Sequence, residues 1–153
     1  MALKQALSLG AILILGAAAM ALPEPHKGMI DNEFVRDVGV VFSKPNFQGD
    51  KKFIFEIKDE SACQVFSAGD LPSVRICKSD VQCNFFTGSN CEVSQSNYAI
   101  GIGCGDVAQV STPVGNYFKH YKCGKVGQLG NVNQTIKTVP HDATANEAEA
   151  MGN

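Results

Sequence analysis

The chain has 153 residues, of which 44% are hydrophobic, and its formal net charge at pH 7 is -2. Its 13 lysine and arginine residues are scattered, without a basic patch or a basic amphipathic helix. The composition therefore gives no support for electrostatic binding to nucleic acid or to an anionic membrane surface, and it is typical of a globular domain.

The first 21 residues have the pattern of a secretory signal peptide. Lys4 supplies a positive charge, residues 6–18 are mostly apolar, and residues 19–21 (AMA) match a small-x-small cleavage site. The apolar run is short for a bilayer span, which needs about 20 residues, although a retained signal anchor is the alternative. Cleavage after residue 21 would leave about 130 residues, the size of one domain with tails. We therefore expect a secreted, extracellular protein.

The next residues divide into an arm and a β-rich domain. Residues 22–36 contain prolines and mixed charges without periodicity, which indicates an extended N-terminal arm. Short apolar segments follow, several of them with the period-two alternation of strands. The predicted strands span residues 38–42, 53–57, 65–66, 74–76, 81–86, 98–104 and 117–123. Turn signals separate them, among them Gly105 with Asp106. Because no helical periodicity occurs after residue 21, residues 37–124 are predicted to form an antiparallel sandwich or barrel.

The end of the chain changes character again. Residues 125–153 are first glycine-rich and polar, then acidic and alanine-rich. Such a segment cannot bury enough apolar surface to offset its ordering entropy, so we expect a flexible, disordered tail. Asn133 begins a glycosylation sequon within it (NQT), which makes it a possible glycan attachment site in a secreted protein.

Six cysteines lie after the predicted signal peptide. They are Cys63, Cys77, Cys83, Cys91, Cys104 and Cys123. An even number behind a secretory signal predicts three disulfides, whereas the alternative of a metal or redox site lacks any Cys-x-x-Cys or zinc-ligand spacing. Six cysteines allow fifteen pairings. One local argument exists, since Cys83 and Cys91 flank a short hairpin-like stretch and could face each other across it.

An aromatic and glycine signature marks the first half of the domain. Residues 42–49 read FSKPNFQG, so Phe42 is followed by Phe47 and Gly49, and Ser73 comes later at the start of an apolar strand. Gly49 can adopt the positive φ that folds a hairpin back onto its sheet. Phe42 can cover that fold, and the Ser73 hydroxyl can satisfy backbone groups that the fold leaves unpaired.

This signature resembles the Greek-key motif of the βγ-crystallins. The resemblance implies a β-sandwich of two four-stranded motifs, stabilised by disulfides, as in secreted microbial members of the superfamily. The second copy departs from the pattern in residues 86–93 (FTGSNCEV), where Cys91 replaces the second aromatic and Val93 the glycine. The serine of that copy aligns best with His120. Independent strands with chance aromatics are the alternative explanation.

The family's calcium-binding sequence is degenerate here. It has two Asp/Asn residues, two variable residues, Ser/Thr and Ser. In residues 68–73 (AGDLPS), Gly69 and Pro72 stand where side-chain oxygens are needed, so we expect no strong calcium site. Asp70 could still bind weakly, although a solvated turn residue is the simpler interpretation. We predict no cofactor.

Other patterns are weighed against ordinary structural roles. Residues 101–105 (GIGCG) superficially resemble a phosphate-binding loop, but close packing of strands is the better interpretation. Three tyrosines and Phe118 could form an outward aromatic platform, or they could pack in the core. His120 stands alone among the three histidines as a domain residue, with nothing to place a nucleophile or a carboxylate beside it.

The functional expectation follows from the resemblance and these patterns. We expect a non-enzymatic, monomeric extracellular protein with a structural or stress-protective role. The alternative is a binding antagonist, such as a toxin, effector, glycan binder or protease inhibitor, that acts on an extracellular protein or glycan through exposed loops. A hydrolase is the third hypothesis, since the absence of a motif is weak grounds for excluding one.

Overall fold

The structure is a computed structural model that describes residues 30–59 and 61–140. The predicted signal peptide 1–21, most of the predicted arm 22–36 and the end of the predicted tail lie outside the described residues. Across the described ranges, no helix has the length and apolar character needed to cross a membrane.

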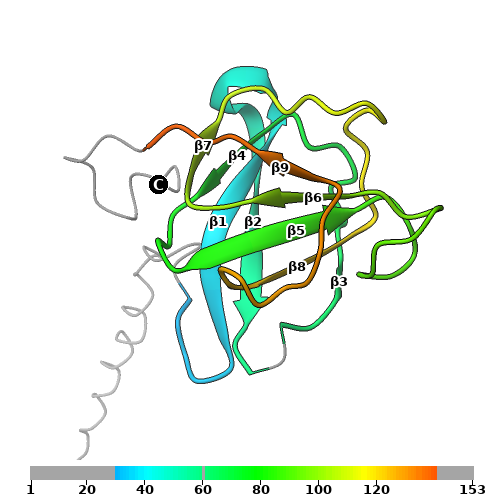
Figure 1. Ribbon diagram of the computed structural model, residues 1–153. Helices are drawn as coiled ribbons and strands as arrows, with labels where there is room; N and C mark the ends of the chain where they lie inside the picture. The colour runs from blue at the N-terminus through cyan, green and yellow to red at the C-terminus, as the bar shows by residue number, and fades with distance from the viewer. Residues whose placement is uncertain (1–29, 60, 141–153) are drawn as a thin grey trace, which may run out of the picture.

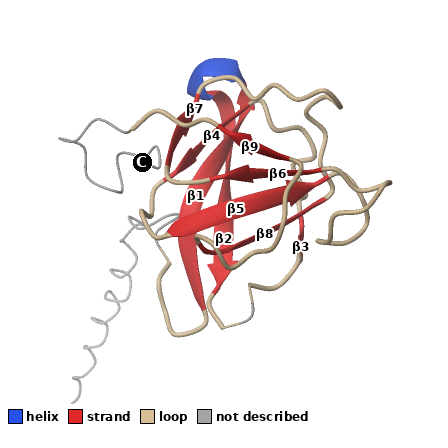
Figure 2. Cartoon of the chain, in the orientation of Figure 1, coloured by secondary structure: helices blue, strands red, loops and turns tan. Residues whose placement is uncertain are grey.

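The described chain is almost entirely strand and loop, which confirms the predicted all-β class (Figure 2). The strands in chain order are β1 (Val35–Lys44), β2 (Gln48–Ile57), β3 (Gln64–Val65), β4 (Ser73–Ile76), β5 (Val81–Phe86), β6 (Ala99–Ile102), β7 (Gly105–Val107), β8 (His120–Lys125) and β9 (Gln134–Ile136). A 3-10 turn, η1 (Pro45–Phe47), joins β1 to β2.

The strands form two sheets (Figure 1). One sheet has the order β2-β1-β4-β7, and the other has the order β3-β8-β5-β6-β9. All neighbouring strands are antiparallel except β6 and β9, which are parallel. β3 and β7 each pair in the sheet opposite to that of the strands on either side of them in the chain. The connections therefore pass from one sheet to the other five times.

Side chains from both sheets meet in one core. The first sheet contributes Val38, Val41, Ile54, Val74 and Ile76, and the second contributes Val81, Phe85, Ile100, Ile102 and Tyr121, among others. Phe85 lies at the centre, with the rings of Phe66, Phe118 and Tyr121 within 6.2 Å of its own. Burial of each such side chain stabilises the fold by about 1.5–3 kcal/mol, so this shared core holds the two sheets together.

Two strands form where the sequence predicts none. The sequence predicts a turn at Gly105 and Asp106, but both residues belong to β7. Gly105 pairs with Ile76 of β4, and Val107 packs in the core beside Val74. Gly105 has a φ of 129°, and this flexibility lets the chain bend into the strand.

The second unexpected strand is β9, which lies in the segment predicted as a flexible tail. It extends the second sheet beside β6, with Ile136 packed against the core. The backbone of Asn133 donates to Ala99 O, and its side-chain oxygen accepts from Ala99 N. Long-range pairing orders this polar stretch, so the domain continues past the predicted boundary at residue 124.

The structure contains two disulfides among the six cysteines, all of which lie in its described part. Cys63 joins Cys91, and Cys83 joins Cys123. The expected local pairing of Cys83 with Cys91 is wrong, because Cys83 faces the core, where its register partner on β8 is Cys123. Cys77 and Cys104 are thiols in this structure, in contrast to the expected third disulfide. Two disulfides are consistent with an extracellular protein.

Candidate functional site

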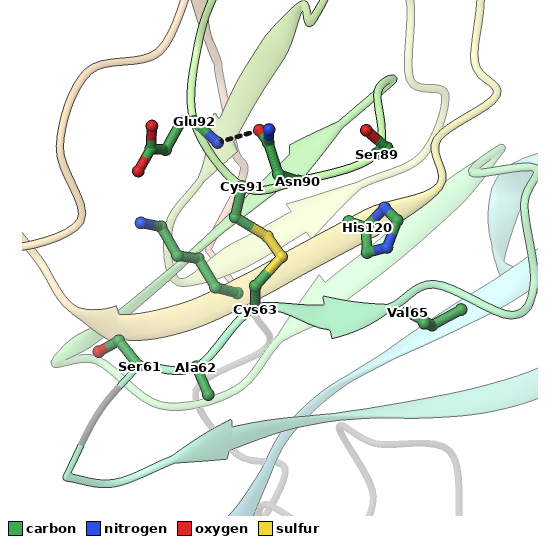
Figure 3. Close-up of a pocket in the computed structure, with 10 residues that line it drawn as sticks. Ser61, Ala62, Cys63, Val65, Ser89, Asn90, Cys91, Glu92 and His120 are labelled. Atoms are coloured by element: carbon green, nitrogen blue, oxygen red, sulfur yellow. Dashed lines mark hydrogen bonds between the residues drawn. A yellow bond between two sulfur atoms is a disulfide. The ribbon is translucent and has the colours of Figure 1, made fainter.

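An open hollow of about 550 Å³ lies beside the Cys63–Cys91 disulfide (Figure 3). Three segments line it: the chain before and within β3, the loop after β5, and β8. The lining residues are Ser61, Ala62, Cys63, Val65, Ser89, Asn90, Cys91, Glu92, His120 and Lys122. The hollow therefore exists only because the fold brings together segments that lie far apart in the sequence.

The disulfide links two of these walls. Cys63 is exposed in the segment before β3, whereas Cys91 is buried in the loop after β5. In Figure 3, Glu92 and His120 lie on opposite sides of the sulfur–sulfur bond. Because a disulfide restricts the relative motion of the segments that it joins, this hollow has a covalently fixed wall.

Asn97 organises the loop that forms the upper wall. Its side chain is 4% exposed, and its Nδ2 donates to the backbone oxygens of Asn90 and Glu92, each at 2.8 Å. Its Oδ1 accepts from Gly88 N at 2.7 Å. A buried amide that satisfies three groups fixes the loop before any ligand arrives, although nothing in the local sequence singles out Asn97 for this role.

His120 stands at the start of β8 and is half-buried. Its Nδ1 lies 2.9 Å from Gly88 O. Since a carbonyl can only accept, Nδ1 carries the hydrogen in this contact, and Nε2 is the nitrogen that a ligand would meet. Ser89 also lines the hollow, but no hydrogen bond links it to the imidazole in the described part of the chain. The geometry places His120 in a structural contact rather than beside an activated nucleophile.

The rim of the hollow carries opposite charges. Glu92 and Lys122 both line it, and both also line a second hollow of about 230 Å³ that extends toward Leu129 and Asn131. With the hydroxyl of Ser61 they provide acceptors and donors of hydrogen bonds. Chemically, the surface is suited to a polar, neutral ligand or to a peptide segment, which would exchange hydrogen bonds with these groups.

The residues of the aromatic and glycine signature meet at the β1–β2 hairpin, away from the hollow. Phe42 is 2% exposed, and its ring packs against that of Phe47 with centroids 5.6 Å apart. Gly49 has a φ of 86°, as its predicted role requires. The Ser73 hydroxyl donates to Lys44 O at 2.7 Å and accepts from Phe47 N at 3.0 Å. The sequence thus correctly identified the residues that hold this hairpin.

Arg75 adds a contact to the hairpin that the sequence did not reveal. Its guanidinium carbon lies 4.2 Å from the centroid of the Phe47 ring. Phe47 has a φ of 61°, which is unfavourable for a residue with a side chain. The cation–π contact and the hydrogen bond from Phe47 N to Ser73 together stabilise this strained residue.

The four aromatic residues considered for a platform separate into different environments. Phe118 and Tyr121 are buried in the core, and the Tyr98 hydroxyl donates to Gln134. Tyr117 is 63% exposed, and its ring covers Gly69 so closely that a Cβ at Gly69 would lie 2.6 Å from it. These residues therefore form no shared outward surface.

The remaining predicted residues occupy structural positions. Asp70 is exposed, while Pro72 is buried and its backbone oxygen accepts from Val110 N. Among the residues that the structure describes, no group of three or more histidine, cysteine or acidic side chains is placed to hold a metal ion. Gly101 packs so closely that a Cβ would lie 2.7 Å from Gln82 Nε2, which confirms close strand packing at this glycine. Asn133 is exposed.

The chain was also compared with known proteins. No protein-family model matches it, and a search of the curated proteins finds no match.

Proposed function

We propose that this chain is a secreted, non-enzymatic protein of the βγ-crystallin type, with a structural or stress-protective role outside the cell. The observation that carries this proposal is a contact that recurs in both halves of the domain, in which a polar side chain opposite an aromatic residue binds a backbone oxygen of the following turn. In the first half Phe42 pairs with Ser73 in register, and Ser73 binds the backbone oxygen of Lys44. In the second half Phe86 pairs with His120, and His120 binds the backbone oxygen of Gly88. Each oxygen belongs to the residue two positions after the aromatic.

The strand order gives independent support. If β1–β4 form one motif and β5–β8 the other, the third strand of each motif, β3 or β7, pairs in the sheet of its partner. Two motifs related in this way would form one Greek-key sandwich with a shared core. The disulfides support a role that depends on resistance to unfolding, because each contributes about 2–4 kcal/mol to the free energy of unfolding by restricting the unfolded chain.

This proposal is tested by melting the purified chain with and without reductant and by searching for ligands in parallel. We expect a high melting temperature that falls sharply when the disulfides are reduced, and no saturable binding to cell-wall glycans or proteases. Calorimetric titration with calcium is expected to give no site of micromolar affinity. A saturable glycan or protease complex would contradict the structural role.

A second candidate is a binding antagonist, and the hollow beside Cys63–Cys91 favours it. Its walls are fixed by a disulfide and by Asn97, and its rim presents both a carboxylate and an ammonium group. A preorganised polar surface of this kind lowers the entropic cost of binding.

The binding candidate is tested with immobilised chitin, immobilised β-glucan and a panel of secreted proteases. Lys122→Ala should weaken any saturable binding at least tenfold, whereas Lys125→Ala, which changes an exposed residue on the same strand outside the hollow, should leave it intact. Equal effects of the two variants would rule out this hollow as the site.

A further inference from the structure

The two cysteines that are thiols in this structure flank the same pair of strands. β4 and β7 are antiparallel, and the last pair of their register is Ile76 opposite Gly105. In an antiparallel pair, one step forward on one strand meets one step back on the other. Cys77 follows Ile76 and Cys104 precedes Gly105, so a register continued one step beyond its last pair would set these two cysteines opposite each other.

The backbone hydrogen bonds show how the two side chains are presented. The backbone nitrogen of Cys77 donates to Val38 O at 2.8 Å, so the backbone N–H of Cys77 points toward β1 rather than toward β7. The backbone oxygen of Cys104 accepts a hydrogen bond from the Thr138 hydroxyl at 2.9 Å, so this oxygen points away from β4. With the register continued to these residues, the cysteines would form a non-hydrogen-bonded pair across β4 and β7. In such pairs the Cα atoms lie about 4.5 Å apart and the side chains are at their closest.

The neighbouring pair confirms this alternation. Asp106 and Val139 exchange both backbone hydrogen bonds, at 2.7 and 2.9 Å, so Asp106 also faces away from β4. Arg75 lies opposite Asp106, and their side chains approach to 3.5 Å between Nε and Oδ1. Cys77 lies two positions after Arg75, and Cys104 lies two positions before Asp106. Because alternate residues of a strand share a face, extended backbone at both ends would place the two cysteines on the face where these side chains meet.

The other sheet contains a disulfide between two directly opposed strand residues. Cys83 on β5 lies opposite Cys123 on β8 in register, and the two are bonded with their Cα atoms 4.1 Å apart. A directly opposed antiparallel pair is thus compatible with a disulfide in this fold.

We propose that Cys77 and Cys104 form a third disulfide that joins β7 covalently to β4. The oxidant is a disulfide, either a small one such as oxidised glutathione or that of a thiol oxidoreductase. The thiolate of Cys104, the more exposed cysteine, attacks one sulfur of the oxidant and releases the first thiol. The Cys77 thiolate then attacks the sulfur of Cys104 and releases the second thiol. Two protein thiols are oxidised, one disulfide is reduced to two thiols, and the two protons pass to the leaving groups.

This bond would fasten the strand that the second half of the chain contributes to the first sheet. β7 has only three residues; within the described residues its one neighbouring strand is β4, and on its other side it has the isolated bridge between Asp106 and Val139. Burial, with a contribution from Asp106, raises the pKa of the Cys104 thiol, so the bond should form faster at mildly alkaline pH.

The experiment uses the full chain, purified without reductant and incubated with oxidised glutathione at mildly alkaline pH. The protein is then denatured, alkylated and digested, and its linked peptides are mapped by mass spectrometry. We expect a peptide pair joined through Cys77 and Cys104 beside the pairs Cys63–Cys91 and Cys83–Cys123. Alkylation of both Cys77 and Cys104, or a link from either to another cysteine, would overturn the proposal.

Two variants give a second readout. In Cys104→Ser, Cys77 should become alkylated while the other two disulfides persist; a Cys77 that is alkylated equally in the parent chain would contradict the link. The oxidised parent should also melt higher than the double variant Cys77→Ser/Cys104→Ser, by on the order of 10 °C. Equal melting temperatures would show that the bond does not hold β7 in place.

Discussion

At the scale of single residues, Gly49 shows how one backbone position permits a hairpin to fold. Its φ of 86° is unfavourable for any residue with a Cβ, and a Cβ here would also collide with the Ser43 hydroxyl oxygen. Gly127 has nearly the same φ, 87°, but an added Cβ would meet nothing within 4 Å. The two glycines therefore separate the cost of backbone strain from the cost of a collision.

Gly127→Ala should lower the free energy of unfolding by about 1–2 kcal/mol, the cost of a left-handed conformation alone. Gly49→Ala should lower it by clearly more, because the hairpin must also shift. Urea denaturation of both variants measures the difference. Equal losses would mean that the close approach to Ser43 is relieved without cost.

Asp37 is a buried carboxyl group that should make stability depend on pH. It is 1% exposed; its Oδ2 accepts from Ile30 N, and within the described residues its Oδ1 has no hydrogen-bond partner. Burial raises its pKa above the ordinary value of 3.8. The folded state therefore binds the proton of Asp37 more tightly than the unfolded chain does. The loss of stability from burying the charged carboxylate is absent in acid and develops as the pH rises through the pKa of the folded state.

Asp37→Asn should consequently gain stability over the parent as the pH rises above about 4, and the gain should be complete at neutral pH. Asp80→Asn is the control with the opposite sign. A hydrogen bond from Arg36 lowers the pKa of Asp80, so this variant should lose stability at neutral pH and approach the parent as the pH falls below 3.8. Urea unfolding curves measured from pH 3 to 7 give the free energy of unfolding of each protein. If this free energy changed with pH in parallel for Asp37→Asn and the parent, the raised pKa of Asp37 would be contradicted.

At the scale of elements, β9 shows that a segment without a strand pattern can complete a sheet. It pairs with β6 through three residues, and Asn133 makes two hydrogen bonds with Ala99 just before it. Without β9, the backbone of β6 would lose its partner on one side and Ile136 would leave the core.

A chain ending at Lys125 should therefore be less stable than one ending at Pro140, by several kcal/mol, because three strand pairs and the packing of the partly buried Ile136 against the core are lost. Thermal melting of the two truncations provides the measurement. Equal melting temperatures would show that β9 adds nothing to the stability of the domain.

At the scale of the whole molecule, the exchange of β3 and β7 makes each sheet depend on both halves of the chain. Neither half can complete its sheet alone, and the core between the sheets draws on both. We expect one cooperative unfolding transition.

The chain contains no tryptophan and three tyrosines, so tyrosine fluorescence and far-UV circular dichroism can follow unfolding in urea. Both signals should change with the same midpoint, because Tyr121 lies in the shared core. Two separated transitions would mean that the halves unfold independently.

The sequence by itself determined the features that depend on neighbours along the chain. Alternating apolar residues identified β1 and β2, a short apolar segment between turn signals identified β5, and the turn chemistry of Gly49 and Ser73 identified the hairpin, because local backbone preferences encode them. Tertiary structure alone decided the pairing of Cys83 with Cys123, the strands β7 and β9, and the hollow at His120. Each of these depends on contacts between residues far apart in sequence, whose register is set by packing of the common core rather than by any local pattern.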